Sequence, residues 1–263
     1  MNKNPPKNGV NSVINTYTIL RALRDEEGAT ITELAEIVEL SPGAIHNHLS
    51  TLESVNMVKK RGKKYVIGPE CLLFGAHVRN HAPVLQAAKG EIDSLAMETG
   101  EIGHIYIEEN GRLFILHEIF GENAVSQNYH IKRREKAHDW LHCTASGKSI
   151  LAEMDESRAE ELIQQSSLTE QTENTITNPD ELLRELEKIR ERGYAYDREE
   201  HITGIRSVGT IVKHDDGSIA GSISLSGPTT RLQDEFFEEE LPLKVKQVAN
   251  ISEVNLQTGD TFF

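Results

Sequence analysis

The sequence predicts an α+β protein in which an N-terminal winged helix-turn-helix is joined by a linker helix to a larger body built on an antiparallel sheet. Three observations support this prediction. Residues 30–68 contain two capped helical patterns followed by a basic hairpin. Residues 69–80 carry one more helical pattern. Residues 81–257 combine helices with hairpins, which favours α+β over a doubly wound sheet. We therefore expect a first domain over 10–70, a linker helix over 69–80 and a second domain over 81–257.

Two short helices joined by a tight turn define the first domain. Before them, apolar residues at helical spacing predict a helix over 13–24. Thr30, with Glu33 three positions later, has the pattern of a capping box, and Ser41 followed by Pro42 marks the start of the next helix. The connection between the two capped helices is only two residues long, which is typical of a helix-turn-helix.

A basic hairpin follows the second capped helix. Residues 57–61 and 64–67 are expected to pair around Gly62, and five of the six residues from 59 to 64 are Lys or Arg. Alone, this hairpin could equally be a solvated edge strand, because lysines commonly protect exposed strand edges. Its position directly after a helix-turn-helix favours a DNA-binding wing.

The second capped helix is expected to present a polar face to DNA. With Ile45 directed into the core, Leu49 and Leu52 fall on the same side, and Asn47 falls opposite. An Asn side chain can donate to and accept from an adenine edge, whereas His48 is expected to pack. A solvated helix face is the alternative that the spacing leaves open. The candidate DNA-contacting residues are Thr30, Ser41, Gly43, Ala44, His46, Asn47, Ser50, Lys59, Lys60, Arg61, Lys63 and Lys64.

Charge is distributed unevenly along the chain. Residues 1–68 hold nine Lys and Arg against seven Asp and Glu, a net charge of +2; the remainder holds 19 against 35, a net charge of −16. A mildly basic head suits contact with phosphates, and an acidic body stays away from them. So acidic a body also suits a high-salt cytoplasm, and we expect a halophilic source.

Composition excludes several classes of protein. No run of about 18 apolar residues is present, which excludes a transmembrane helix of ordinary length. The N-terminus lacks an apolar signal core, so we expect a cytoplasmic protein without membrane partners. Cys71 and Cys143 cannot form a disulfide framework and lack metal-ligand spacing. We expect neither a metal nor a cofactor.

The second domain is expected to begin and end with a helix. A basic patch at 132–136 is expected to be a solvated loop. Helices are predicted over 84–99, 144–154, 156–166 and 179–192, with a closing helix over 232–256 that Pro242 kinks or divides. Hairpins are predicted from 102–108 with 113–119 and from 205–214 with 218–226, and a further strand over 194–199.

Polar residues stand where a core is expected in the last predicted strand. Ser222, Ser224 and Ser226 alternate with two apolar residues, so the serines share one face of the sheet. If that face is buried, its hydroxyls need partners from the backbone or from a small polar ligand. The backbone N–H groups of 145–147, before a helix start, suit a carboxylate. A solvent-exposed serine face is the equal alternative.

Common catalytic motifs are absent from the sequence. Gly147-Lys148-Ser149 resembles the end of a phosphate-binding loop, but His142 occupies the position of the required glycine. Cys143 beside His142 is the only local nucleophile and base, and neighbouring residues of an extended segment point apart. We therefore expect no catalytic residues.

The chain resembles the IclR family of transcriptional regulators from about residue 10 to residue 256. In the first domain the resemblance lies in Leu34-Ala35, Leu40-Ser41, His48-Leu49, Leu52-Glu53 and 65–68. In the second it lies in 95–96, 99–101, LHCTASGKSILA at 141–152, IRERGYAYDREEHITGIRSVG at 189–209 and GSISLSGPTTR at 221–231. Together these segments are far more specific than a helix-turn-helix alone.

The resemblance implies a GAF/PAS-like effector domain, a homodimer or homotetramer, a palindromic double-stranded DNA operator and a small organic acid or catabolic metabolite as effector. By position, it implies effector contacts from Ser146, Gly147, Asp197, Ser207, Ser224 and Ser226. Two departures matter. Ser207 stands where the family commonly has cysteine, and Asn47 stands where the recognition helix commonly has arginine.

Two other functions compete with a ligand-responsive regulator. One is an enzyme with a GAF-like catalytic body and a DNA-binding head, which would require Cys143 for turnover. The other is an architectural DNA-binding protein without a ligand, in which side chains would fill the space over the serine face.

Overall fold

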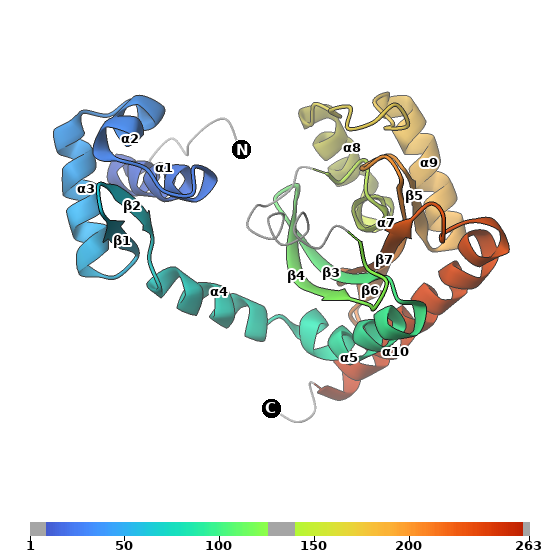
Figure 1. Cartoon of the computed structure of the whole chain (residues 1–263). Helices are drawn as coiled ribbons and strands as arrows, with labels where there is room; N and C mark the ends of the chain where they lie inside the picture. The colour runs from blue at the N-terminus through green and yellow to red at the C-terminus, as the bar shows by residue number, and fades with distance from the viewer. Residues whose placement is uncertain (1–8, 126–139, 260–263) are drawn as a thin grey trace. The chain divides into compact units, whose positions relative to one another are not determined.

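The computed structural model describes residues 9–125 and 140–259 (Figure 1). Contacts between Cα atoms divide the chain into one compact unit that ends at His81 and a second that begins at Ala82. The predicted basic patch at 132–136 lies outside the described residues. No helix in the described parts of the chain is both long and apolar enough to cross a bilayer.

Three helices pack around one core in the first unit: α1 (Asn11–Asp25), α2 (Ile31–Val38) and α3 (Pro42–Ser54). Helix α2 begins with the expected capping box, in which Thr30 Oγ1 accepts from the Glu33 amide at 3.3 Å and Glu33 accepts from the Thr30 amide at 2.7 Å. Ser41 Oγ accepts from the Ala44 amide at 3.2 Å at the start of α3. These caps satisfy amides that have no partner inside their helices, so each start is fixed locally.

A two-stranded hairpin completes the winged module. Strands β1 (Val58–Arg61) and β2 (Lys64–Ile67) pair antiparallel, with Arg61 opposite Lys64 across a turn at Gly62. Gly62 has φ of +63°, a conformation that favours glycine. Val58 and Tyr65 point into the core with Ile45 and Leu49 of α3, so the hairpin is anchored by its apolar residues and its basic residues remain outside.

Helix α4 (Glu70–Asn80) follows the hairpin and contains no buried residue. It begins one residue later than the sequence predicted. By its contacts it belongs to the first compact unit.

A five-stranded antiparallel sheet of order β4-β3-β7-β6-β5 forms the centre of the second unit. Its strands are β3 (Ile102–Glu109), β4 (Arg112–Phe120), β5 (Ala195–Arg198), β6 (Ile205–Lys213) and β7 (Ile219–Pro228). The predicted hairpins are both present, and β7 of the second hairpin pairs with β3 of the first, which makes β7 the central strand. The strand with three serines is therefore the most enclosed strand of the sheet.

Helices cover both faces of this sheet. Helices α5 (Pro83–Thr99) and α10 (Leu241–Gly259) pack in one apolar cluster with Ile223 and Leu225 of β7. Helices α7 (Ala145–Glu153), α8 (Glu156–Gln165) and α9 (Pro179–Arg192) contribute to a second cluster (Figure 1). Ser222, Ser224 and Ser226 are all buried, so the predicted alternative of a solvent-exposed serine face is wrong.

The closing helix is shorter than predicted. A π-helical turn over Phe236–Glu240 precedes α10, and Leu232 lies before both. Pro242 has no N–H to donate to the carbonyl of Glu238, four residues earlier. The Tyr196 hydroxyl donates to that carbonyl at 2.8 Å instead. Pro242 thus divides the segment, and a side chain from β5 satisfies the backbone group that it frees.

Candidate functional site

The outer face of α3 is exposed, as a groove-reading helix requires. Gly43, His46, Asn47 and Ser50 are exposed, and Ala44 is half-buried. His48 is half-buried, and its Nδ1 lies 2.9 Å from Thr16 Oγ1 of α1. Asn47 thus lies on the outer face while His48 packs against α1.

The caps and the wing differ in how freely their polar atoms can reach DNA. Thr30 and Ser41 use their hydroxyls as helix caps. Lys64 Nζ donates to the Gly28 carbonyl at 3.3 Å, and Lys60 Nζ lies 5.5 Å from the centre of the Tyr65 ring. Lys59, Arg61 and Lys63 are exposed at or near the hairpin turn.

A buried polar cavity in the second unit brings together five of the six residues expected to bind an effector. Ser146, Asp197, Ser207, Ser224 and Ser226 line it. Its volume of about 20 Å³ is sufficient for a single water molecule, so any larger ligand requires its walls to move. No Lys or Arg is among the described residues that line it.

The start of α7 forms one wall of this cavity. Thr144 caps the helix by accepting from the Gly147 amide at 3.1 Å, so Gly147 offers no free N–H and does not line the cavity. In the described structure the Gly147 amide is thus engaged by the cap, and a contact between Gly147 and the effector stays a prediction. Ser146 is 1% exposed, and its hydroxyl has no hydrogen-bond partner.

Strand β6 approaches the start of α7 closely. A Cβ at Gly209 would lie 3.0 Å from the backbone nitrogen of Ser146. On the same strand, Ser207 Oγ lies 2.8 Å from Ser226 Oγ of β7, which partners two of the buried hydroxyls with each other. The sheet and the helix start thus meet through small residues, and polar atoms remain between them.

Asp197 lies at the end of β5 and is 3% exposed. Its Oδ1 accepts from the backbone amides of Glu200 at 2.8 Å and His201 at 3.3 Å. Burial, reinforced by the nearby Glu200 carboxylate, raises the pKa of Asp197 to about 7, although Lys148 and the two amides oppose this. This carboxyl group therefore keeps its proton to a higher pH than an exposed Asp does.

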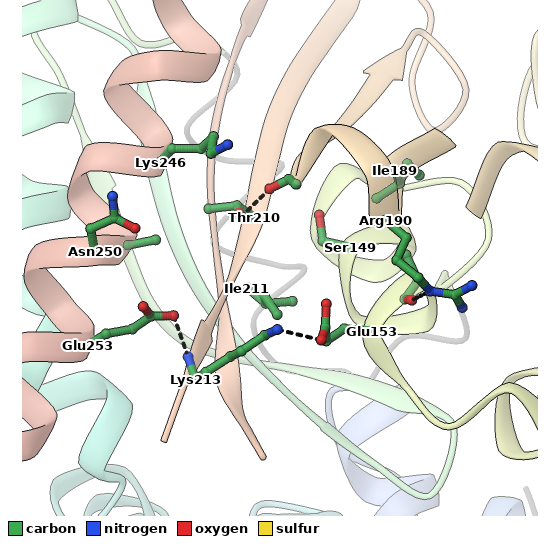
Figure 2. A pocket seen from close by; sticks show the side chains of 13 residues that line it. Ser149, Glu153, Ile189, Arg190, Thr210, Ile211, Lys213, Lys246, Asn250 and Glu253 are labelled. Atoms are coloured by element: carbon green, nitrogen blue, oxygen red, sulfur yellow. Dashed lines mark hydrogen bonds and ion pairs between the residues drawn. The ribbon is translucent and has the colours of Figure 1, made fainter. Parts of the chain in front are cut away.

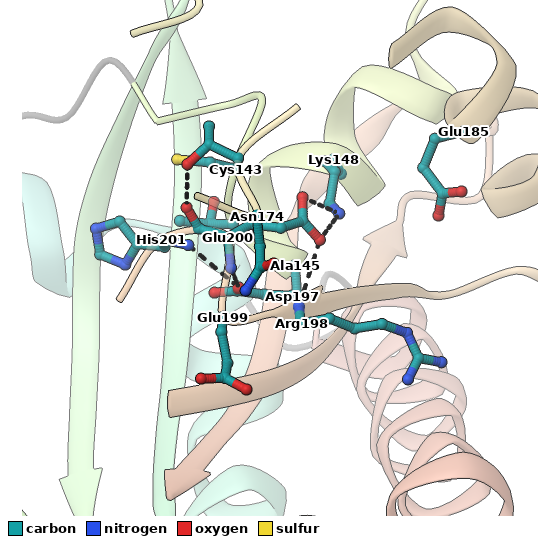
Figure 3. Close-up of polar contacts among 12 residues, drawn as sticks. Cys143, Ala145, Lys148, Asn174, Glu185, Asp197, Arg198, Glu199, Glu200 and His201 are labelled. Atoms are coloured by element: carbon teal, nitrogen blue, oxygen red, sulfur yellow. Dashed lines mark hydrogen bonds and ion pairs between the residues drawn. The ribbon is translucent and has the colours of Figure 1, made fainter. Parts of the chain in front are cut away.

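Lys148 and Glu200 form a buried ion pair near Asp197 (Figure 3), and neither of them lines the cavity. Lys148 Nζ donates to both Glu200 oxygens, at 2.5 and 2.6 Å, and is itself 1% exposed. Burial raises the pKa of Glu200 despite the opposing charge of Lys148. Because Lys148 directs its charge at Glu200, it does not supply a cation to the cavity.

Sequence reasoning missed the rest of the cavity wall. Two of the missed residues had a usable signal, because His104 and Tyr106 alternate on β3 and stand opposite Ser224 and Ser222 in the sheet register. The others come from the helix cap and from the loop after β5, which sequence spacing could not bring together. The missed residues are His104, Tyr106, Thr144, His201, Ile202 and Ile205, whereas Ala145 was expected to contribute a backbone N–H group.

Cys143 and His142 do not form a catalytic pair in the described structure. His142 Nε2 donates to the Thr169 carbonyl at 3.1 Å, and burial lowers the pKa of this imidazole. Cys143 is fully buried, and its Sγ lies 4.0 Å from the Trp140 carbonyl. Neither residue lines the cavity. Among the described residues, no group of three or more His, Cys, Asp or Glu could hold a metal ion.

A larger hollow of about 220 Å³ lies between α7, α9, β6 and α10 (Figure 2). Its cations already have partners: Lys213 pairs with Glu153, Arg190 Nε donates to the Ala152 carbonyl, and Lys246 donates to the Arg192 carbonyl. We therefore place the candidate binding site in the smaller cavity, where an unpartnered hydroxyl and a perturbed carboxyl group meet.

Comparisons with known proteins match both parts of the chain to bacterial transcriptional regulators. Residues 76–253 match the model of the bacterial transcriptional regulator IclR C-terminal domain, and residues 17–60 match that of the bacterial regulatory protein arsR family. The chain is 36% identical over 251 residues to the "Probable HTH-type transcriptional regulator ArcR" of Halobacterium salinarum, covering 95% of each chain. It is 28% identical to the HTH-type transcriptional regulator KdgR of Escherichia coli, covering 88% of this chain and 87% of KdgR.

Solved structures show the same architecture. The IclR of Thermotoga maritima superposes with a TM-score of 0.70 at 29% identity, covering 95% of this chain and 98% of the other. An IclR homologue from Microbacterium hydrocarbonoxydans, complexed with 4-hydroxybenzoate, superposes with a TM-score of 0.79 at 18% identity over 94% of this chain and 99% of the other, which supports the fold alone.

The chain belongs to the IclR family of transcriptional regulators, with an N-terminal helix-turn-helix and a C-terminal effector-binding domain. The expected α+β class is confirmed. A relative in Halobacterium salinarum also fits the expectation of a halophilic source.

Proposed function

We propose that this regulator binds a palindromic operator through α3 and the wing, and that a small polar organic acid in the cavity of the second unit changes its operator affinity in the cytoplasm. The observation that carries the proposal is the contrast in exposure. The candidate DNA contacts of α3 and the wing lie mostly on the surface, whereas five candidate effector contacts enclose one polar cavity.

The lining of the cavity favours a small polar acid over an aromatic one. Hydroxyl groups line the cavity from the sheet, at Ser207, Ser224 and Ser226, and from the start of α7, at Ser146. The amides of Ala145 and Ser146 lie in the first turn of α7, where the helix dipole favours an anion. A flat aromatic ring would separate the hydroxyls from their partners without replacing them.

Exposed apolar side chains on α1 and α4 support a homodimer formed by the first unit. Val13 and Tyr17 share one face of α1 and are 65% and 49% exposed. On α4, Leu72, Phe74 and Val78 are 72%, 58% and 60% exposed. Apolar surface of this extent on one small unit is typical of an interface, and a second copy provides the same surface. A dimer would also explain recognition of a palindrome.

Coupling between effector and operator requires two arrangements of the dimer. The effector acts only through the difference between its affinities for them, and the operator acts on the effector to the same extent. Because the described cavity holds about one water molecule, ligand entry must displace α7 or the loop after β5.

Titration of the DNA fragment upstream of the protein's own gene tests the operator half. We expect tight binding at moderate ionic strength. Changing Lys63 to Ala should weaken binding on specific and random DNA alike and lower the salt slope by about one. Lys89→Ala is the matched control, because Lys89 has an exposed side chain on α5. Absence of binding to any genomic fragment would overturn the operator half.

Binding of small acids tests the effector half. We expect a hydroxy or keto acid to bind the full chain and to change its operator affinity. Ser224→Val, which replaces a buried hydroxyl and a Cβ hydrogen with two methyl groups, should abolish that response. Operator affinity that does not change when a bound acid saturates the cavity would contradict the proposal, and turnover of the acid would favour the enzyme instead.

A further inference from the structure

The effector cavity contains a carboxyl group where an acid ligand would be expected to meet a cation. Asp197 lines the cavity, and no Lys or Arg of the described residues does so. The buried cation Lys148 of α7 donates to both oxygens of Glu200. An ionised ligand and an ionised Asp197 would therefore repel each other in a site with little water to screen them.

The hydrogen bonds of Asp197 leave one of its oxygens available. Oδ1 accepts from the amides of Glu200 and His201, whereas Oδ2 accepts no hydrogen bond from the described residues. A proton on Oδ2 would make this oxygen a donor without disturbing the bonds to Oδ1. The unpartnered Ser146 hydroxyl belongs to the same cavity and could bond to a second oxygen of the ligand.

We propose that the cavity binds its acid effector together with one proton, which Asp197 donates as a hydrogen bond to the ligand carboxylate. This inference rests on the proposed effector function and adds the protonation state that recognition requires. One proton moves from solvent to Asp197 Oδ2 when the ligand binds to the ionised site and forms an O–H bond there, and no covalent bond of the ligand changes. Two carboxyl groups that share one proton are a stable arrangement in a buried site.

The other charged and titratable groups described around Asp197 do not supply the ligand carboxylate with a proton or a positive charge in place of Asp197. Behind it lie Lys148 of α7 and Glu200, which neutralise each other. His104 of β3 contacts Glu118 at 3.1 Å, and the His201 ring packs 4.3 Å from the Trp140 ring. The facing residues of β6 and β7, Ser207 and Ser226, are uncharged. The raised pKa of Asp197, about 7, agrees with a carboxyl group that accepts a proton easily.

Calorimetric proton counting on the full-length protein tests this inference. The probes are glycolate, pyruvate, glycerate and gluconate, each titrated at pH 6.0 and 8.5 in buffers of different ionisation enthalpy. We expect proton uptake to rise from near zero at pH 6.0 to about one per site at pH 8.5. Above pH 7, Kd should weaken about tenfold per pH unit. Binding without proton uptake at either pH would overturn this inference and leave the proposed function intact.

The Asp197→Asn variant identifies the proton's site. Asn Oδ1 can accept from the same two amides while its NH2 group donates permanently to the ligand. We expect the variant to bind the probe with the same Kd at both pH values, whereas Glu161→Gln, at an exposed side chain of α8, should behave as wild type. Proton uptake that persists in Asp197→Asn would assign the proton to a histidine and overturn the inference. If none of the four acids binds wild type, the acid-effector function and this inference both fail.

Discussion

The first and second units present their candidate functional residues in opposite ways. On α3 and the wing these side chains are mostly exposed, and removing one leaves the core of the unit unchanged. In the effector-binding domain the candidates are buried, and several are bonded to each other or to the backbone. The comparison teaches that DNA contacts can change at little cost in stability, whereas each change in the cavity alters folding and binding together.

The largest expected effect is on the ion pair behind the cavity. Lys148→Met leaves the Glu200 carboxylate buried without a cation and should lower the free energy of unfolding by about 3–5 kcal/mol. Denaturant unfolding followed by fluorescence measures this, because Trp140, the chain's single Trp, belongs to the second unit. The exposed Lys188→Met is the matched control, and Lys148→Met with Glu200→Gln should recover most of the loss. No loss in the single variant would contradict a buried pair.

The next effect depends on pH and has a defined sign. The pKa of Asp197 rises from 3.8 in the unfolded chain to about 7 in the folded protein, so its contribution to stability is lost as pH rises from about 4 to 7. Asp197→Asn avoids that loss and should be more stable than wild type by up to about 4 kcal/mol at pH 8, with little difference near pH 4. Unfolding curves at both pH values measure it. If the difference in the free energy of unfolding between Asp197→Asn and wild type were equal at the two pH values, Asp197 would not titrate in this range.

A smaller effect is expected at the start of α3. Ser41→Ala removes the cap on the Ala44 amide and should destabilise this helix by about 1 kcal/mol. Amide hydrogen exchange across 42–54 should accelerate about fivefold, while exchange in β7 stays at the wild-type rate. Ser41→Thr is a suitable control because it retains the cap. Equal acceleration in both units would show that they do not open independently.

The smallest effect on stability is expected in the wing. Lys63→Ala should change the free energy of unfolding by no more than about 0.5 kcal/mol, because the side chain is exposed. The same variant should weaken DNA binding measurably. If instead its stability fell as much as that of Lys148→Met, the contrast between the two units would not hold.

The sequence alone determined the features that depend on neighbours along the chain. The caps at Thr30 and Ser41, the hairpin around Gly62 and the alternation of serines on β7 follow from spacing and backbone preference. The resemblance to the IclR family added the set of residues expected around the effector, and the structure brings five of those six to one cavity.

Only the tertiary structure decided which of those groups remain free to bind a ligand. The Lys148–Glu200 pair joins residues 52 positions apart and engages the Lys148 ammonium group with a carboxylate that does not line the cavity. The Thr144 cap uses the Gly147 amide, and the packing of α7 against β6 buries Ser146 without a partner. Burial and hydrogen-bond satisfaction depend on elements distant in sequence, so spacing can bring candidates to one face but cannot show which of them remain available.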